Sequence, residues 1–174
     1  MTNSEQQKHD SLAERFSARF GARVLETDRS YGDLVFVVEK AAVHEVLSYL
    51  RNDEKFDLLL DIAGVDCVQL PEYRERFELE YILYSTGNEH RMRVRVPVPE
   101  FALDVPTATD LWRSANWAER EVHEMFGFVF TGHPCLKRLL THQQFEGHPL
   151  RKDYPLMEGQ WCTTTSNLEE ELEE

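Results

Sequence analysis

The chain has 174 residues, of which 41% are hydrophobic and 11% are aromatic. This composition suits a single domain with a buried core and excludes wholesale disorder. Nineteen basic residues against 32 acidic ones leave a formal net charge of −13. Because such a polyanion repels phosphate backbones and anionic lipids, nucleic acid and bare membrane are poor partner hypotheses.

The sequence carries no signal for a membrane span or a bound cofactor. Its longest stretch without a formal charge, Met125 to Leu136, is shorter than the roughly 18 apolar residues of a membrane helix, and the polar N-terminus predicts no signal peptide. The chain has an odd number of cysteines, and they are widely spaced, at Cys67, Cys135 and Cys162. This pattern predicts free thiols in a reducing compartment. A Cys-x-x-Cys pair, a P-loop and a Gly-x-Gly-x-x-Gly fingerprint are all missing, so the usual signs of a redox or nucleotide enzyme are absent.

Two helices are predicted in the first third of the chain. Residues 1–10 are expected to be a flexible lead-in, after which the capping box Ser11-Leu-Ala-Glu14 begins a helix that ends at Gly21. Farther along, apolar residues at i, i+3, i+4 and i+7 predict a helix over 43–50 that packs on a sheet.

Strands surround these helices. The sequence predicts strands at 22–27 and 33–39, joined by a polar turn at 28–32, and a largely buried strand at 56–67.

The clearest pairing lies between residues 76 and 98. Alternating apolar residues and a two-residue loop at Gly87-Asn88 predict a hairpin. Its expected register is Leu83 opposite Met92, Tyr81 opposite Val94, Leu79 opposite Val96 and, on the other face, Glu80 opposite Arg95.

A basic row, Arg91, Arg93 and Arg95, follows the second strand of this hairpin. It could form a nucleic-acid stripe, but a solvated strand face answered by Glu78 and Glu80 is the stronger interpretation, given the net charge.

The last third changes to helix and then to turn-rich chain. Capping boxes at Thr107-x-x-Asp110 and Asn116-x-x-Glu119 predict two short helices that meet near Ala115, and Gly127 is expected to close the second.

Together these elements predict an α+β fold, in which a mixed, largely antiparallel sheet packs with helices and an extended, turn-rich C-terminal arm follows. The expected divisions are an α+β domain over 11–126, a docking arm over 127–157 and a solvated acidic tail over 158–174.

The second of these helices carries several charged residues. Its predicted apolar stripe is Trp117, Ala118, Val122, Met125 and Phe126, with an i, i+4 pair between Arg120 and Glu124. Carboxylates here could serve acid–base catalysis, but no nucleophile with a paired base accompanies them, so capping of backbone amides and orientation of arginine is favoured.

Beyond this helix, Phe126, Phe128 and Phe130 would line one side of an extended chain, either as core or as interface anchors. Gly-His-Pro then occurs twice, at 132–134 and 147–149. A metal site is one interpretation of the four local histidines, which are His123, His133, His142 and His148. Their spacing matches no common zinc pattern, so hydrogen bonds that lock turns are favoured.

The segment from Pro149 to Pro155 is expected to be extended, with Arg151 and Lys152 exposed. Residues 117–155 hold five acidic and five basic groups, so the rest of the chain (27 acidic, 14 basic) carries the whole net charge. A charge-balanced, aromatic surface on an acidic body indicates a protein interface.

These residues also resemble a known family. The ordered combination of Glu119-Arg-Glu-x-x-Glu124-Met-Phe-Gly127, His133-Pro-x-Leu-Lys-Arg-Leu-Leu140 and the run from Phe145 to Leu156 is similar to the C subunit of proton-pumping NADH:quinone oxidoreductase, respiratory complex I. The likeness covers roughly residues 33–157.

The resemblance implies a non-catalytic structural subunit of the peripheral arm of that enzyme, with no active site, cofactor or metal of its own. It implies a peripheral position on the cytoplasmic face of the bacterial inner membrane, docked onto the quinone-pocket subunit and cluster-bearing subunits. The candidate interface residues are Glu119, Arg120, Glu121, Glu124, Phe126, Phe130, His133, Lys137, His148, Arg151, Lys152 and Asp153.

Two alternatives stay open. The chain could be the equivalent subunit of a membrane-bound hydrogenase or of a ferredoxin-linked quinone reductase, because nothing in it identifies the electron donor. A free-standing metalloenzyme built on Glu121, His123, His133 and His148 is the alternative from another class.

Overall fold

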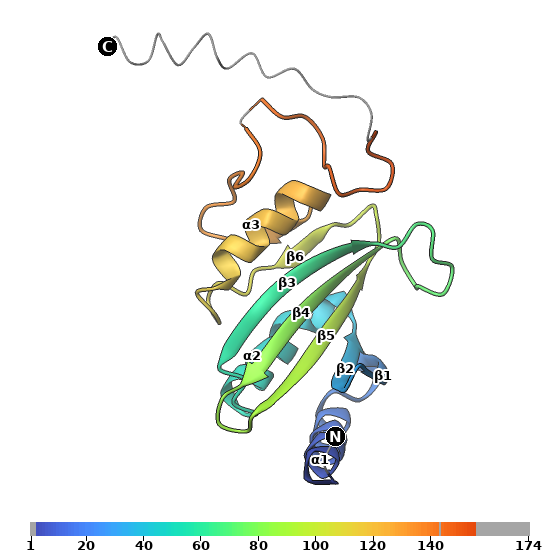
Figure 1. The fold of residues 1–174 in the computed structure, drawn as a ribbon, viewed down its shortest axis with the longest axis vertical. Helices are drawn as coiled ribbons and strands as arrows, with labels where there is room; N and C mark the ends of the chain where they lie inside the picture. Colours follow the sequence, from blue (N-terminus) through green and yellow to red (C-terminus); the bar gives the residue numbers. More distant parts are fainter. Residues whose placement is uncertain (1–2, 143, 156–174) are drawn as a thin grey trace.

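The fold is given by a computed structural model, which describes residues 3–142 and 144–155 (Figure 1). The predicted acidic tail and the last two residues of the C-terminal arm lie outside the described residues. The helices are α1 (Asn3–Phe20), α2 (Val43–Asn52) and α3 (Ala115–Phe126), and the strands are β1 (Val24–Ser30), β2 (Asp33–Val38), β3 (Leu58–Asp66), β4 (Phe77–Ser85), β5 (His90–Val98), β6 (Asp104–Pro106) and β7 (Val129–Thr131).

Five strands form one sheet in the order β1-β2-β5-β4-β3. All neighbours in it are antiparallel except β2 and β5, which run parallel. The short β6 and β7 pair in parallel as a second sheet. The predicted α+β class with a mixed, largely antiparallel sheet is therefore confirmed.

The register predicted for the β4–β5 hairpin is confirmed at each of its pairs, from Leu83 opposite Met92 to Glu80 opposite Arg95. The loop is longer than expected, because pairing stops at Ser85 and His90 and leaves four residues between the strands. Glu89 takes a left-handed backbone conformation with φ of 55°, which allows the longer turn to close without changing the register.

The core lies on one face of the sheet, where apolar side chains of α1, α2 and α3 pack together. Side chains that alternate along the central strands point into it, and Tyr81 is fully buried. The ring of Phe16 on α1 stacks on Phe36 of β2 with centroids 3.9 Å apart. The predicted face of α2 is buried as expected, namely Val43, Val46, Leu47 and Leu50.

The opposite face of the sheet carries the basic row, and each of its arginines forms a salt bridge with an acidic side chain. Arg93 donates to Asp33 at 2.9 Å and to Glu80 at 3.3 Å, and Arg95 lies 3.5 Å from Glu78. The predicted pairing of the basic row with Glu78 and Glu80 is confirmed, but the expectation of a solvated face is wrong, because Glu78 is buried and Arg93 and Arg95 are half-buried. Asp33 of β2 is a partner that sequence reasoning did not identify.

Two expectations near the N-terminus are wrong. Helix α1 begins at Asn3 rather than at Ser11, so most of the expected lead-in is helical. Strand β1 continues to Ser30, and the turn is only Tyr31-Gly32, both with positive φ (51° and 92°). Such a pair closes a tight hairpin, which made the expected five-residue turn too long.

The expected helix at Thr107–Asp110 is also wrong, because residues 107–114 form turns and α3 is the one helix in this region of the described chain. The N-cap of α3 is Ser114, which makes no side-chain cap bond, and Asn116 lies inside the helix. Glu119 instead accepts a hydrogen bond from the hydroxyl of Thr107. One residue from each expected capping box thus takes part in a bond that links the turn to the helix.

No helix within the described residues is long and apolar enough to cross a membrane. Cys67 and Cys135 are free thiols as predicted, and Cys162 lies outside the described residues.

Candidate functional site

Helix α3 and the C-terminal arm that follows it contain all the candidate interface residues. The helix ends where predicted, at Gly127, whose φ of 87° is left-handed and whose N–H donates to the carbonyl of His123 at 2.8 Å. From there the arm passes through β7 and a series of turns across α3 and the end of the sheet (Figure 1).

Glu124 on α3 fixes the middle of the arm. Its buried carboxylate accepts the backbone N–H groups of Leu139 at 2.6 Å, Leu140 at 2.9 Å and Thr141 at 2.5 Å. Burial raises the pKa of this carboxyl, but the bonds from the Thr141 hydroxyl and the three amides outweigh it and lower the pKa to about 2. Glu124 is therefore a charged anchor for the chain, as expected of a carboxylate that caps amides.

Glu119 lies five residues earlier on the same helix, and its pKa is shifted in the opposite direction. Its fully buried carboxyl accepts from the Thr107 hydroxyl and the Ala108 N–H, both at 2.6 Å. Burial dominates here and raises the pKa to about 7 against the effect of these two bonds. Glu119 thus fixes the turn before α3, and its proton is released only as the pH approaches 7.

The two arginines of the site also bind backbone carbonyls. Arg120 donates to the carbonyls of Lys137 at 2.8 Å and Arg138 at 2.9 Å, in place of the expected pair with Glu124. Arg151 donates to the carbonyl of Phe126 at 2.6 Å and lies over the ring of Phe77. The expectation of an exposed Arg151 in an extended segment is wrong, because successive turns direct its guanidinium inward.

Three histidines of the site bond to backbone groups, as favoured from the sequence. His123 Nδ1 donates to Phe128 O at 2.6 Å, and His148 Nδ1 donates to Glu124 O at 2.9 Å. His133 donates through Nε2 to Asn116 O at 3.0 Å. Within the described residues, no group of three or more histidine, cysteine, aspartate or glutamate side chains is placed to hold a metal ion.

The end of the arm is joined to β3 through Asp66, which sequence reasoning did not identify. Its buried carboxylate accepts the backbone N–H of Lys152 at 2.9 Å and pairs with Arg76 at 3.2 Å, while Arg76 also pairs with Asp153 at 2.8 Å. Burial raises the pKa of Asp66, and its bonds outweigh that effect so that the pKa is lowered. A buried aspartate at the end of a strand was the available signal.

The three phenylalanines that could have been core or interface anchors, Phe126, Phe128 and Phe130, are buried and belong to the core. The ring of Phe126 packs so closely on Gly64 of β3 that a Cβ there would lie 2.6 Å from it. The side chains exposed at the surface are instead Glu121, Lys137, Lys152 and Asp153.

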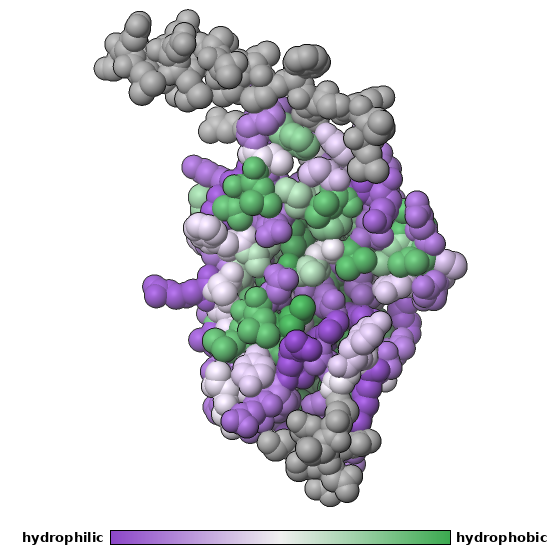
Figure 2. Space-filling view, viewed as in Figure 1, coloured by the Kyte–Doolittle hydropathy of each residue, from purple (hydrophilic) through white to green (hydrophobic). Residues whose placement is uncertain are grey.

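Large apolar side chains are exposed in the same region. Trp117 is 66% exposed, Leu140 62% and Leu150 51%. The expectation that Trp117 belongs to the buried stripe of α3 is wrong, because Glu119 occupies the buried face that the stripe was assumed to share. Figure 2 shows hydrophobic clusters separated by hydrophilic side chains on one face of the molecule.

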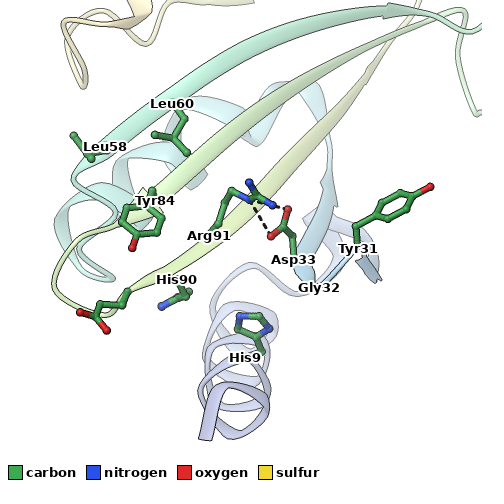
Figure 3. A pocket seen from close by; sticks show the side chains of 10 residues that line it. His9, Tyr31, Gly32, Asp33, Leu58, Leu60, Tyr84, His90 and Arg91 are labelled. Atoms are coloured by element: carbon green, nitrogen blue, oxygen red, sulfur yellow. Dashed lines mark hydrogen bonds and ion pairs between the residues drawn. The ribbon is translucent and has the colours of Figure 1, made fainter. Parts of the chain in front are cut away.

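A surface cavity of about 630 Å³ lies at the other end of β4, lined by Leu58, Leu60 and Tyr84 among others (Figure 3). Arg91 lies in it with its Nε donating to both carboxylate oxygens of Asp33 at 3.0 Å. None of the candidate interface residues lines this cavity, so the cavity and the α3–arm region are separate features.

The sequence matches a protein family over most of its length. Residues 36–160 match the family described as respiratory-chain NADH dehydrogenase, 30 Kd subunit. A relative from Erythrobacter litoralis, the C subunit of an NADH-quinone oxidoreductase, is 45% identical over 136 residues, which are 78% of this chain and 53% of the relative.

Two further relatives carry the same name. The one from Novosphingobium aromaticivorans is 41% identical over 85% of this chain and 47% of the relative, and the one from Trichlorobacter lovleyi is 41% identical over 82% and 87%. The chain thus spans about half the length of the first two relatives and most of the third.

Solved structures have a similar fold. A trypsin-resistant fragment of Nqo5 is 36% identical with a TM-score of 0.65, covering 73% of this chain and 98% of the fragment. A chain of the membrane-bound sulfane sulfur reductase, an archaeal respiratory membrane complex, has a TM-score of 0.73 at 22% identity over 86% of this chain and 87% of its own, a likeness of fold alone. With the family model and the relatives, this places the chain in the 30 kDa subunit family of respiratory-chain NADH dehydrogenase, to which the bacterial C subunits belong.

Proposed function

We propose that this chain is a non-catalytic structural subunit in the peripheral arm of a proton-translocating NADH:quinone oxidoreductase. It docks onto the quinone-pocket subunit and nearby cluster-bearing subunits and so supports electron transfer from NADH to quinone, while the electron carriers belong to its neighbours. In this role it is a peripheral protein on the cytoplasmic face of the bacterial inner membrane. Membership of the 30 kDa subunit family supports the proposal.

The observation that carries the docking role is the way in which the arm is held. Hydrogen bonds to backbone groups of the arm come from Arg120 and Glu124, and Arg151 of the arm bonds to the backbone at the end of α3. These bonds fix the course of the arm, on which Leu140 and Leu150 are exposed. Exposed large apolar side chains on a rigid backbone are typical of a surface that another protein covers.

The test compares apolar residues of the arm with one elsewhere. Leu140→Asp and Leu150→Asp are introduced into a tagged chain, and the amount of quinone-pocket subunit that co-purifies from detergent-solubilised membranes is measured by mass spectrometry. A buried carboxylate is costly at an interface, so we expect a fall of roughly tenfold or more. Phe101→Asp is the matched control, because Phe101 is 91% exposed outside this region.

Unchanged co-purification of both leucine variants would contradict the docking role of the arm. Arg151→Glu is a poor test of docking, because Arg151 bonds to Phe126 inside the subunit and its loss would disturb folding as well. Circular dichroism of the leucine variants confirms that the subunit itself remains folded.

A further inference from the structure

Arg113 and Trp117 stand four residues apart at the start of α3 and line one groove. Arg113 lies in the turn before the helix and Trp117 in its first turn, and both are exposed. The groove has a volume of about 570 Å³, and Gly132 and Pro134 of the C-terminal arm form part of its wall. It therefore adjoins the docking region without being made of the same residues.

Arg113 differs from the other arginines of this protein. Within residues 3–142 and 144–155, it is the one arginine whose side chain makes no hydrogen bond, ion pair or ring contact. The carboxylate in the groove, Asp110, pairs instead with His44 at 2.9 Å. Arg113 thus lines the groove with an unpaired side chain, while the carboxylate of Asp110 is engaged with His44.

The helix strengthens this local positive potential. The first turn of α3 contains no acidic residue, so the positive end of the helix dipole beside Trp117 is not offset by a side chain of that turn. Asp110 and Arg113 are the charged residues of the groove, and because Asp110 is paired with His44, the unpaired guanidinium of Arg113 is complementary to an acidic group of a partner.

The two side chains are also of the types that dominate binding energy at protein interfaces. An arginine guanidinium matches a carboxylate with two parallel hydrogen bonds. An indole that is 66% exposed offers a large apolar face that association would cover. Both side chains line the same groove, which allows one partner segment to engage both.

We propose that Arg113 and Trp117 bind a segment of a neighbouring subunit that carries a carboxylate next to an aromatic or branched aliphatic side chain. The carboxylate pairs with Arg113, and the apolar side chain packs on the indole of Trp117. This inference rests on the proposed function, because it names a second contact of the same subunit within the complex.

The first test identifies the occupant of the groove in the intact complex. The photoreactive residue benzoylphenylalanine replaces Trp117 in the tagged chain, the purified complex is irradiated, and the cross-linked peptide is sequenced by mass spectrometry. We expect one peptide of a neighbouring subunit with an aspartate or glutamate within a few residues of an aromatic or aliphatic side chain. A cross-link within this chain, to a second copy of it, or to a segment without an acid would overturn the proposal.

The second test measures the contribution of each side chain. Arg113→Glu and Trp117→Ala should each reduce retention of the cross-linked subunit through a salt wash by at least about tenfold, and Arg113→Lys should lose less than Arg113→Glu. Tyr31→Ala and Arg74→Glu are controls, since both residues are exposed away from this groove. Unchanged melting temperatures show that the variants are folded.

The outcomes separate this inference from the proposed function. If the wild-type chain co-purifies with the complex and both groove variants are retained like wild type, the groove contact is wrong and the docking role stands. If the wild-type chain is recovered without any subunit of the complex, the proposed function fails and the groove contact fails with it.

Discussion

The sheet with its covering helices, here called the body, and the C-terminal arm are held by different forces. The body is organised by apolar side chains such as Phe16, Phe36 and Tyr81, which are fully buried. Beyond β7, whose Phe130 belongs to the core, the arm is held by directional bonds from Glu124 and Arg120 to backbone groups 15 to 18 residues away in sequence. Because apolar burial is non-directional and shared among many contacts, whereas these bonds are few, the arm should be displaced by substitutions that leave the body folded.

The largest effect is expected in the body. Phe36→Ala removes a buried ring that stacks on Phe16, and it should lower the free energy of unfolding by about 3–5 kcal/mol. Urea denaturation of the purified chain measures this loss. Leu60→Ala is the control at a half-exposed position, with a change within about 0.5 kcal/mol. If Phe36→Ala lowered the free energy of unfolding by less than the arm variant Glu124→Gln, the distinction between the two regions would be wrong.

The pH dependence of Glu119 gives the next largest effect. Its folded pKa of about 7 lies above the ordinary value of 4.5, so the folded chain retains a proton that the unfolded chain releases. The stability that this group contributes is complete below pH 4.5 and is lost as the pH rises toward 7, by on the order of 3 kcal/mol. Urea denaturation of wild type and Glu119→Gln from pH 4.5 to 8 should show a steeper decline in wild type, because the variant keeps only the contributions of the other titrating groups. Equal slopes would contradict the assignment.

Substitution of Glu124 should loosen the arm and spare the sheet. Glu124 accepts hydrogen bonds from three backbone N–H groups through its carboxylate. Glu124→Gln replaces this carboxylate by a neutral side-chain amide, which should lower the free energy of local unfolding of the arm by about 2 kcal/mol. Hydrogen–deuterium exchange should then accelerate about thirtyfold at residues 139–141 and remain unchanged in β4 and β5. Glu121→Gln, on the exposed side of the same helix, is the control. Equal acceleration in the sheet would mean that arm and body unfold together.

Glu124 also has a pH signature opposite to that of Glu119. Its folded pKa of about 2 lies below the ordinary 4.5, so its stabilising contribution is present above pH 4.5 and is lost as the pH falls toward 2. Acid should therefore release the arm, which the same exchange measurement detects at residues 139–141.

The smallest effect of the series is expected at the junction of the two regions. Gly127→Ala places a side chain on a backbone with φ of 87°, 2.6 Å from the Arg151 guanidinium and 2.7 Å from the His148 ring. We expect a loss of about 1–2 kcal/mol from the backbone conformation alone, measured by thermal unfolding. Gly87→Ala, where a Cβ meets nothing within 4 Å, should change stability by less than about 1 kcal/mol.

The same contrast explains what could be predicted from the sequence. The hairpin register, the buried face of α2 and the end of α3 at Gly127 follow from local periodicity and from residues that each favour one conformation. These features depend on neighbours in sequence or on alternation within a strand, and the structure confirms them.

The positions of Arg151 and Trp117 could not be derived in this way. Arg151 is directed inward by turns that bring it to Phe126, 25 residues away, and a charged side chain gives no sign of whether a backbone carbonyl will be its partner. Trp117 lies outside the core because the face of α3 that packs on the core includes Glu119, which periodicity alone assigns to solvent. Carboxylates that are buried because backbone N–H groups bond to them were therefore the main reason why sequence-based predictions of the site failed.

The central claim is that the C-terminal arm and the start of α3 form a surface that is covered by a neighbouring subunit. Hydrogen–deuterium exchange of the chain alone and within the purified complex tests it directly. We predict that assembly slows exchange at residues 137–142 and 148–153 and near Trp117, with little change along β1. Slower exchange confined to the cavity around Leu58 and Tyr84, with an arm that exchanges as fast as in the free chain, would contradict the claim.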